Sequence, residues 1–385
     1  MLQVLWLCSW YPNNVLPFEG DFIQRHAQAT SLHNKIHVIK LTPDPNAKNV
    51  TRVTRTYQQW PNLTETYIYY PKPKSIIGKA VAYMRWYSLY KFAIESYFAK
   101  NEKPDLVHVQ IPFKAGIIAK QIKQKYKIPF VVTEHWGGYN RIVENNYWQR
   151  EPWFKRVVKD TFKNASSLHS VSQFLADEIN ASVAQVSFKV IPNVVNTEYF
   201  NTGQHIESWG KLRLLHISSG VLVKNVPGII DAFNQLDDNE YELTIVGLPT
   251  AENDEYKKRH QNIQFIGEVS YKEVAAYLGR ADALIVFSFI ENSPCVISEA
   301  LCCGVPVVAS AVGGIPELVD HTNGLLTEPG NVPALATSIK TFKDCIHQYD
   351  RKEIADKAQK RYSYAVIAAQ MNEWYNTVLQ QQLPE

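Results

Sequence analysis

Short apolar runs recur along the whole chain, separated by longer segments with helical spacing, and this alternation most strongly limits how the chain can fold. In the first half the runs cover residues 3–7, 36–41, 106–110, 129–135, 166–172 and 189–195. In the second half they cover residues 212–218, 242–247, 263–267, 283–289 and 305–310. The runs lack polar alternation, which is typical of parallel strands buried on both faces. The pattern therefore predicts an α/β fold with doubly wound parallel sheets.

A chain of 385 residues is too long for one ordinary core, so we expect two domains. The strand–helix pattern breaks around residues 200–211, which are polar and carry two glycines. We therefore predict Rossmann-like domains over residues 1–205 and 206–364, with a terminal helix over 365–385 that returns to the first domain. Ligands of such sheets bind outside the carboxyl ends of the strands, so the cleft between the two domains is the predicted site.

Composition narrows the class of protein. The formal charge of +3 is too near balance to indicate a nucleic-acid partner. The five cysteines are odd in number and form no C-x-x-C pair, which favours a reduced, cytoplasmic compartment. We interpret the first apolar run as a buried strand rather than a signal segment, and no apolar run is long enough to span a membrane.

Segments 76–100 and 145–163 mix aromatic with basic residues. Interfacial helices at a membrane surface have this composition. An apolar stripe packed into the first domain explains it equally well, and the sequence leaves both readings open.

The stretch ENSPCVISEALCCGVPVVAS, residues 291–310, places Glu291 and Glu299 eight positions apart around a predicted helix start. Ser293 is a good N-cap and Pro294 suits the first helical position, with the helix running to Cys303. Free N–H groups, such as those of Cys295 and Val296, would favour a phosphate. Glu299 could accept hydrogen bonds from a ribose diol, and Glu291 could reach a sugar hydroxyl. A phosphate flanked by ribose and hexose is a nucleotide sugar, although two ordinary surface glutamates remain the alternative.

This stretch resembles the E-x7-E motif of retaining glycosyltransferases of family 4, which have the two-lobed GT-B fold. The resemblance covers nearly the whole chain. It includes the segments KPDLVHVQ (103–110), TEHWGGY (133–139), SVSQF (170–174), VIPNVVNTEYF (190–200), VGGIPELVD (312–320) and NGLL (323–326). It implies two Rossmann-like domains that face each other across a cleft, with the acceptor bound by the first and the nucleotide sugar by the second.

The resemblance also implies roles for residues in the second domain. Glu299 falls where the family binds the ribose, and Glu291 where it contacts the donor sugar. Lys224 falls on the lysine that neutralises the leaving diphosphate. Ser219 stands where the family usually has an arginine, so Arg25 or Arg141 of the facing domain could supply the missing charge.

Four positions after Glu291 are expected to contact the donor through side chain or backbone: Asn292, Ser293, Cys295 and Val296. The family often has glycines here, and Pro294 lacks an N–H. In the first domain, the resemblance assigns His135 to the donor sugar and Gly20 to the loop that touches the donor phosphate and the acceptor. His108 and His169 are expected to be core residues.

The reaction implied is retaining transfer of a hexose from a nucleotide diphosphate sugar to a hydroxyl of a glycan or polyprenyl-linked acceptor. The leaving diphosphate can take the acceptor proton. No cofactor is implied, and no metal either, because the sequence has no Asp-x-Asp. A peripheral contact with the inner face of the cytoplasmic membrane is a further hypothesis. The alternatives are a nucleotide-sugar 2-epimerase or sugar phosphorylase on the same fold, a non-enzymatic sugar-binding protein, and an inactive relative.

Overall fold

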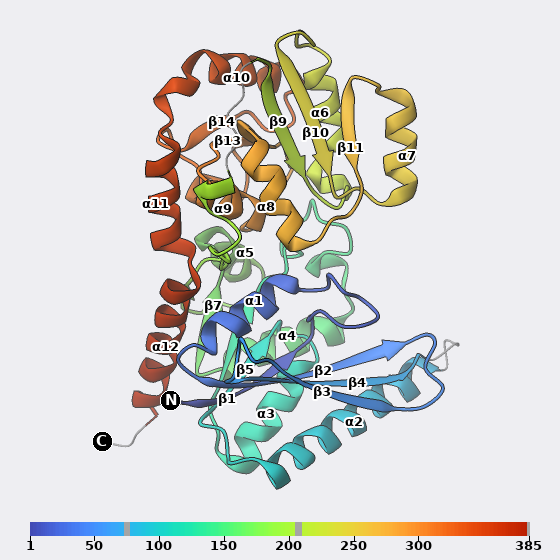
Figure 1. Ribbon diagram of the computed structural model, residues 1–385. Coiled ribbons are helices and arrows are strands. Elements are labelled where there is room, and N and C mark those ends of the chain that lie inside the picture. Colours follow the sequence, from blue (N-terminus) through green and yellow to red (C-terminus); the bar gives the residue numbers. More distant parts are fainter. Residues whose placement is uncertain (73–77, 205–209, 383–385) are drawn as a thin grey trace.

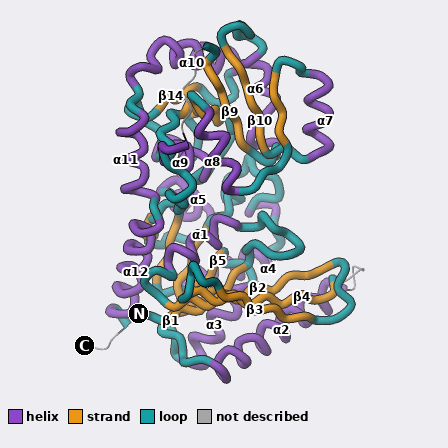
Figure 2. Tube along the Cα trace, in the orientation of Figure 1, coloured by secondary structure: helices purple, strands orange, loops and turns teal. Residues whose placement is uncertain are grey.

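The computed structural model describes residues 1–72, 78–204 and 210–382. It contains two sheets, each covered by helices on both faces, as the sequence predicts (Figure 1). Figure 2 shows the strands gathered in two separate groups with helices around each. The predicted domain boundary at residues 205 and 206 lies outside the described residues.

Within the described residues the first sheet has eight strands in the order β3-β4-β2-β1-β5-β6-β7-β8. In chain order they are β1 (Gln3–Cys8), β2 (Lys35–Asp44), β3 (Thr51–Thr56), β4 (Leu63–Pro71), β5 (Leu106–Gln110), β6 (Phe130–Glu134), β7 (Ser167–Ser170) and β8 (Phe188–Val190).

Two neighbouring strands of this sheet, the edge strand β3 and its partner β4, match no predicted run. β3, with the sequence TRVTRT, is mostly exposed and therefore carries no apolar run. It pairs antiparallel with β4, while all other pairs in the sheet are parallel. The expectation of only parallel strands is therefore wrong at this edge of the sheet. A polar edge strand disfavours pairing of the sheet edge with another chain.

Within the described residues the second sheet has six parallel strands in the order β11-β10-β9-β12-β13-β14. They are β9 (Leu212–Ile217), β10 (Tyr241–Val246), β11 (Ile263–Ile266), β12 (Ala283–Val286), β13 (Val307–Ser310) and β14 (Gly324–Thr327). The first five match predicted runs. β14 is only four residues long and was not predicted.

The α-helices of the first sheet's region are α1 (Asp21–Thr30), α2 (Gly78–Lys100), α3 (Ala115–Tyr126), α4 (Pro152–Asn164) and α5 (Gln173–Ser182). Those that follow are α6 (Val226–Phe233), α7 (Thr250–Arg259), α8 (Tyr271–Arg280), α9 (Cys295–Cys302), α10 (Val332–Cys345), α11 (Arg351–Tyr362) and α12 (Tyr364–Gln380). Short 3-10 turns cover Tyr147–Gln149, Thr202–Gln204, Leu222–Lys224, Ile315–Glu317 and Ile346–Gln348.

Alternate residues of β1 serve two cores. Leu5 and Leu7 face a cluster shared with α2, α3, α4 and α5. Val4 and Trp6 face a second cluster, shared with α1 and with α12. The last helix therefore packs against the first sheet, and Figure 1 shows α11 and α12 running from the second sheet down the side of the first.

Polar side chains on β5, β6 and β7 of the first sheet are buried and hydrogen-bonded. His108 of β5 bonds Tyr375 of α12 and Thr133 of β6. His169 of β7 bonds Thr133 and the carbonyl of Ile191. Both imidazoles are fully buried, so their assignment to the core is confirmed. In the described ranges, no helix combines the length and the apolar character that crossing a bilayer requires.

Candidate active site

α9 starts one residue later than expected and is capped differently. It spans Cys295–Cys302, and Pro294 occupies the N-cap position without any side-chain cap. Ser293 lies one position farther out, too far for its hydroxyl to reach the N–H groups of the first turn. That hydroxyl is buried and has no hydrogen-bond partner in the described part of the chain. The predicted Ser293 cap is therefore wrong.

The start of α9 presents free donors all the same. Among the described residues no acceptor faces the N–H groups of Cys295 and Val296, whereas the N–H of Ile297 bonds the Pro294 carbonyl at 3.1 Å. Unpaired N–H groups at a helix start favour an anion. With no side-chain cap in the way, a phosphate can take the place that a serine oxygen usually fills.

Glu291 and Lys224, predicted separately, form an ion pair. The Lys224 Nζ lies 2.6 Å from Oε1 of Glu291, and the same oxygen accepts a 2.7 Å bond from the hydroxyl of Ser288. Oε2 of Glu291 has no partner within the described ranges. The carboxylate is therefore fixed through one oxygen, and the other remains available to a ligand.

A pair of glycines holds the loop that carries Glu291. The N–H of Gly314 donates to the Glu291 carbonyl at 2.9 Å. Gly313 has a φ of +54°, and a Cβ on it would lie 1.9 Å from that carbonyl oxygen. Only glycine allows this approach, so the GG of VGGIPELVD has a packing reason.

Six of the predicted residues surround one cavity of about 350 Å³ between the two sheets. They are His135, Lys224, Glu291, Asn292, Ser293 and Cys295. The cavity is bounded by segments that follow β1 and β6 in the first sheet and β9 and β12 in the second. It thus lies at the carboxyl ends of strands, where ligands of open α/β sheets bind.

Four predicted residues do not line this cavity. Val296 packs on an apolar cluster of the second domain, so only its backbone could contact a ligand there. Ser219 is exposed in the loop after β9. Gly20 is buried, is the N-cap of α1 with a φ of +65°, and packs against Trp10. Glu299 lies one turn into α9 and has its own surroundings.

Glu299 faces Arg25 of α1 at the junction of the two domains. The Arg25 NH2 is 3.7 Å from Oε1 of Glu299, and both side chains are buried. Arg25 also pairs with Asp21 at 2.6 Å and stacks 4.2 Å above the ring of Tyr271. Burial raises the pKa of the Glu299 carboxyl to about 7, against the opposing effect of Arg25. Cys295 lies four positions earlier, on the same face of α9, so Glu299 adjoins the cavity.

Arg25 and Arg141, the two residues expected to replace the arginine missing at position 219, lie in different places. Arg25 reaches the Glu299 end of the site and not Lys224. Arg141 is exposed and stacks 4.6 Å from the ring of Trp148. Neither side chain lines the cavity around Lys224.

His135 follows β6 directly and lines the cavity. Its Nε2 is 3.2 Å from Oε1 of Gln110, so the proton of the neutral ring is placed on Nε2. Burial holds the pKa of His135 well below its usual value, and nearby His26 lowers it further. Nδ1 is left as an acceptor, and it has no partner in the described residues.

Glu134 was not predicted from the sequence, yet it holds the turn beside the cavity. Its Oε1 accepts the N–H groups of His135 at 2.8 Å and Trp136 at 2.9 Å, and its Oε2 accepts the Tyr139 hydroxyl at 2.6 Å. These three bonds fold the turn that presents His135 and Gly137 to the cavity. Burial raises the pKa of Glu134 to about 7. An acidic residue between a buried strand and a cavity histidine was the available signal.

Asn193, Trp10 and Phe22 also line the cavity without having been predicted. Asn193 donates from Nδ2 to the Ser293 carbonyl at 2.9 Å and so joins the first domain to the start of α9. Asn292 makes the reciprocal link, donating from Nδ2 to the His135 carbonyl at 3.1 Å. The asparagine of IPNVVN was a visible signal, whereas the two aromatic residues had none.

A further contact joins the domains beside the cavity. Glu317 accepts the N–H groups of Gln173 at 2.9 Å and Phe174 at 2.7 Å, at the start of α5. A carboxylate at a helix N-terminus is stabilising. Across the described residues no group of three His, Cys, Asp or Glu side chains has an arrangement that could hold a metal ion. Independence from metal stays a prediction.

Two family models match the chain in succession. "Glycosyltransferase Family 4" matches residues 29–199, and "Glycosyl transferases group 1" matches residues 203–361. The chain belongs to glycosyltransferase family 4. The recognition made from the E-x7-E stretch is thereby confirmed.

Two proteins from Bacillus are similar in sequence to this family 4 glycosyltransferase. The putative teichuronic acid biosynthesis glycosyltransferase TuaC of Bacillus subtilis is 24% identical over 98% of this chain and 99% of that protein. The N-acetyl-alpha-D-glucosaminyl L-malate synthase of Bacillus anthracis is 25% identical over 73% of this chain and 77% of that protein.

Solved structures of similar fold confirm the GT-B architecture of the glycosyltransferase. Sucrose-phosphate synthase from Thermosynechococcus elongatus superposes with a TM-score of 0.78 at 21% identity, covering 99% of this chain and all (100%) of that one. Anabaena HepE in complex with UDP-glucose has a TM-score of 0.68 at 20% identity, covering 98% of this chain and 100% of that one.

Proposed function

We propose that this family 4 glycosyltransferase moves a hexose from a nucleotide diphosphate sugar to an acceptor hydroxyl with retention of the anomeric configuration. The observation that carries the proposal is the Lys224–Glu291 pair beside the uncapped start of α9. A cation and free N–H groups converge there on one cavity. This arrangement suits the diphosphate of a nucleotide sugar. A nucleotide sugar, UDP-glucose, is the ligand in the structure of Anabaena HepE.

In the proposed complex the diphosphate lies between Lys224 and the amides of Cys295 and Val296. The hexose contacts Oε2 of Glu291, Asn292 and Nδ1 of His135, and the ribose binds Glu299. As the bond from C1 of the hexose to the phosphate oxygen breaks, negative charge grows on the leaving group. Lys224 and the helix start stabilise that charge, which a preorganised site does without rearrangement.

The acceptor hydroxyl approaches C1 from the face that the diphosphate leaves. The new bond joins the acceptor oxygen to C1, and the acceptor proton passes to the departing phosphate oxygen. No protein base is required. Since Ser219 replaces the usual arginine, Lys224 carries the neutralisation of the leaving group.

The proposal places the acceptor in the first domain, residues 1–205, and the nucleotide sugar in the second, 206–364. Its acceptor is a glycan or a polyprenyl-linked sugar, which accords with the name of TuaC, a putative enzyme of teichuronic acid biosynthesis. The anomeric outcome is read by NMR of the product: retention of the donor configuration supports the proposal, and inversion contradicts it.

A contact with the inner face of the cytoplasmic membrane belongs to the same proposal. Much of the aromatic content of segment 76–100 is packed, with Trp86 and Tyr90 in the core. Met84 and Phe92 of α2 remain 59% and 62% exposed, and Trp153 of α4 is 46% exposed. Flotation with anionic vesicles at low and high salt tests the contact, and no binding at low salt contradicts it.

The donor is tested by a thermal-shift screen of nucleotide diphosphates and their sugars, followed by transfer assays with the stabilising donor. Lys224→Met should lower turnover by about 10²-fold or more, the usual effect of losing one group that stabilises a developing anion. Lys258→Met, an exposed lysine on α7, is the matched control. Equal activity of both variants would remove the basis of the proposal.

A further inference from the structure

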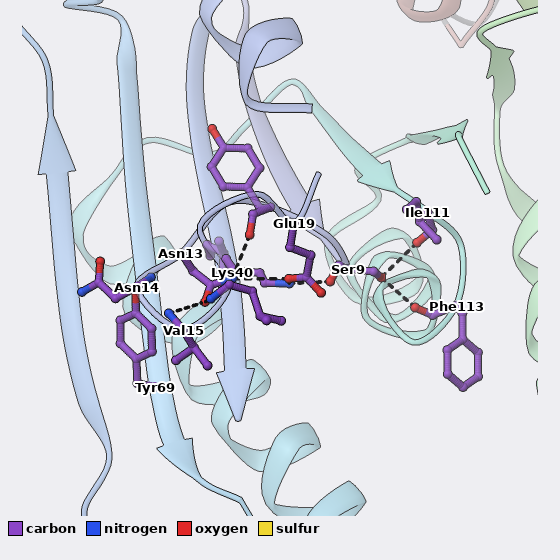
Figure 3. A network of polar contacts seen from close by, with 12 residues as sticks. Ser9, Asn13, Asn14, Val15, Glu19, Lys40, Tyr69, Ile111 and Phe113 are labelled. Atoms are coloured by element: carbon purple, nitrogen blue, oxygen red, sulfur yellow. Dashed lines mark hydrogen bonds and ion pairs between the residues drawn. The ribbon is translucent and has the colours of Figure 1, made fainter. Parts of the chain in front are cut away.

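A second cavity, of about 440 Å³, lies in the first domain at the carboxyl ends of β1 and β2. We call the cavity of about 350 Å³ beside Lys224 and Glu291 the donor cavity. The second cavity is separate from it except at Trp10, which lines both. Figure 3 shows a polar network that includes Ser9, Glu19 and Lys40, three residues that line this cavity. We call it the basic cavity because of the lysines described below.

Lys40 is the fixed cation of the basic cavity. Its side chain is 4% exposed, and its Nζ donates to the Ser9 carbonyl at 2.5 Å and to Oε2 of Glu19 at 2.7 Å (Figure 3). Glu19 contributes the carboxylate of the lining. Its negative charge is balanced by the ion pair with Lys40. An ammonium has three N–H donors, and two are accounted for here.

The Ser9 hydroxyl ties down the loop that carries a second lysine. It lies 3.1 Å from the carbonyl oxygen of Ile111 and 2.8 Å from that of Phe113 (Figure 3). Ile111 and Lys114 both have positive φ, at 67° and 66°. A β-branched residue in this region is a genuine outlier. The loop is therefore held in one costly conformation, and Lys114 lines the cavity as a result.

Lys114 has no carboxylate partner in the described residues. Its Nζ lies 5.7 Å from the ring centroids of both Trp86 and Phe113. Partial burial lowers the pKa of Lys114 from its usual value, an effect that an anionic partner would offset. Lys72, which is exposed, lines the same cavity. Thr42 lines it too, is 3% exposed, and its Oγ1 has no partner within the described ranges.

The charges and the wall indicate the kind of ligand. Among the described residues, Lys114 and Lys72 have no anionic partner and the Thr42 hydroxyl is unpaired. All three line a cavity whose own carboxylate, Glu19, is already paired with Lys40. The lining also includes the aromatic residues Trp86, Tyr90 and Tyr70. Flat apolar rings of this kind pack against sugar rings or isoprenoid chains, while the lysines require an oxyanion.

We propose that the basic cavity binds the acceptor through an oxyanion, a phosphate or a carboxylate, held by Lys114 and Lys72. This inference rests on the proposed function, since it names the chemistry of the acceptor. Because Trp10 borders both cavities, an acceptor anchored here can extend its reacting hydroxyl past Trp10 toward the donor sugar. The anion fixes the acceptor's orientation and takes no part in bond making.

Calorimetric titrations of the full chain test the inference, with the donor cavity first filled by the nucleoside diphosphate that the screen selects. The probes are glucose 6-phosphate, glucuronate and glucose, which differ only at C6. We expect at least one of the two anions to bind about tenfold or more tightly than glucose, with an affinity that falls as salt rises. The tighter anion identifies phosphate or carboxylate as the preferred group.

Lys114→Met should abolish that preference, and Lys114→Arg should retain most of it. Lys163→Met removes an exposed lysine of α4 with the same change of charge and should leave the preference intact. Equal binding of all three sugars by the unaltered chain, or equal behaviour of the Lys114→Met and Lys163→Met variants, would overturn the inference. Failure here with intact nucleotide binding and transfer leaves the proposed function standing, whereas absence of nucleotide binding contradicts the proposed function itself.

Discussion

Arg25 and Glu299 approach each other from different domains, with NH2 of the guanidinium 3.7 Å from Oε1 of the carboxylate. Both side chains are less than a tenth exposed, at 8% and 7%. The proposed ribose must therefore bind a carboxylate that already faces a cation. Burial raises the pKa of Glu299 to about 7, and Arg25 opposes this rise by favouring the ionised form.

Arg25→Met should weaken nucleotide diphosphate binding at pH 7 by about fivefold or more, because loss of the cation raises the pKa of Glu299 further above 7. At pH 8.5 much of the affinity should return, since the carboxylate ionises again. Calorimetric titration at the two pH values checks this. Arg52→Met, an exposed arginine on β3, is the control. Tighter binding by Arg25→Met at pH 7 would show instead that Arg25 competes with the nucleotide.

The pKa of Glu299, raised to about 7 by burial, predicts a pH dependence of donor binding. The ionised carboxylate accepts both ribose hydroxyls, so affinity should be constant above pH 8 and should fall toward tenfold per unit below pH 6. Glu299→Gln should bind weakly and with a flatter profile. An unchanged profile in this variant would assign the dependence to another group, Glu134 being the first to examine.

The same raised pKa makes a prediction about stability. A folded pKa of about 7, above the usual 4.5, means that the folded state binds the proton more tightly than the unfolded chain does. The contribution of Glu299 to the free energy of unfolding is therefore favourable below pH 4.5 and is lost as the pH rises through 7. Thermal unfolding at pH 8 should show Glu299→Gln to be at least as stable as the unaltered chain. A clear loss of stability would contradict the sign.

Glu134→Ala should lower both activity and stability, because three buried donors lose their acceptor. Unsatisfied buried groups of this kind cost about 1–3 kcal/mol each when the structure does not adjust. As a positioning residue, Glu134 should affect turnover more than the affinity for the nucleotide alone. Glu134→Gln can still accept the two N–H bonds and should recover part of the turnover. Equal defects in the two variants would argue against positioning.

Gly313→Ala should disturb the Glu291 loop. The added Cβ would lie 1.9 Å from the Glu291 carbonyl oxygen, and alanine is strained at a φ of +54°. The conformational term alone costs about 1–2 kcal/mol, and the contact adds to it. Chemical denaturation and transfer rates check the result against Gly203→Ala, which alters an exposed glycine without a positive φ. A fully active and stable Gly313→Ala would show that the loop tolerates a shift.

Most of the sheet framework was predictable because buried parallel strands leave continuous apolar runs. β3 was not, since TRVTRT is an exposed edge strand whose identity depends on its pairing with β4. Glu291, Lys224 and His135 could be placed because each stands next to a strand or helix end. Their meeting at one cavity, and the contact of Arg25 with Glu299, depend on how two domains sit together, which no local pattern encodes.

The start of α9 shows a different limit. Ser-Pro before an apolar run is a strong sign of a capped helix, yet Pro294 takes the cap position and the Ser293 hydroxyl has no partner among the described residues. The Ser293 carbonyl accepts a hydrogen bond from Asn193 of the other domain. Without a side-chain cap, the helix start has donors that are free for a ligand.

A crystal structure of the chain with a non-transferable nucleotide diphosphate sugar bound would show where the diphosphate lies. We expect the diphosphate within hydrogen-bond distance of the Lys224 Nζ and of the N–H groups at the start of α9, with the ribose at Glu299. A diphosphate bound elsewhere, with Lys224 still paired only to Glu291, would contradict this expectation.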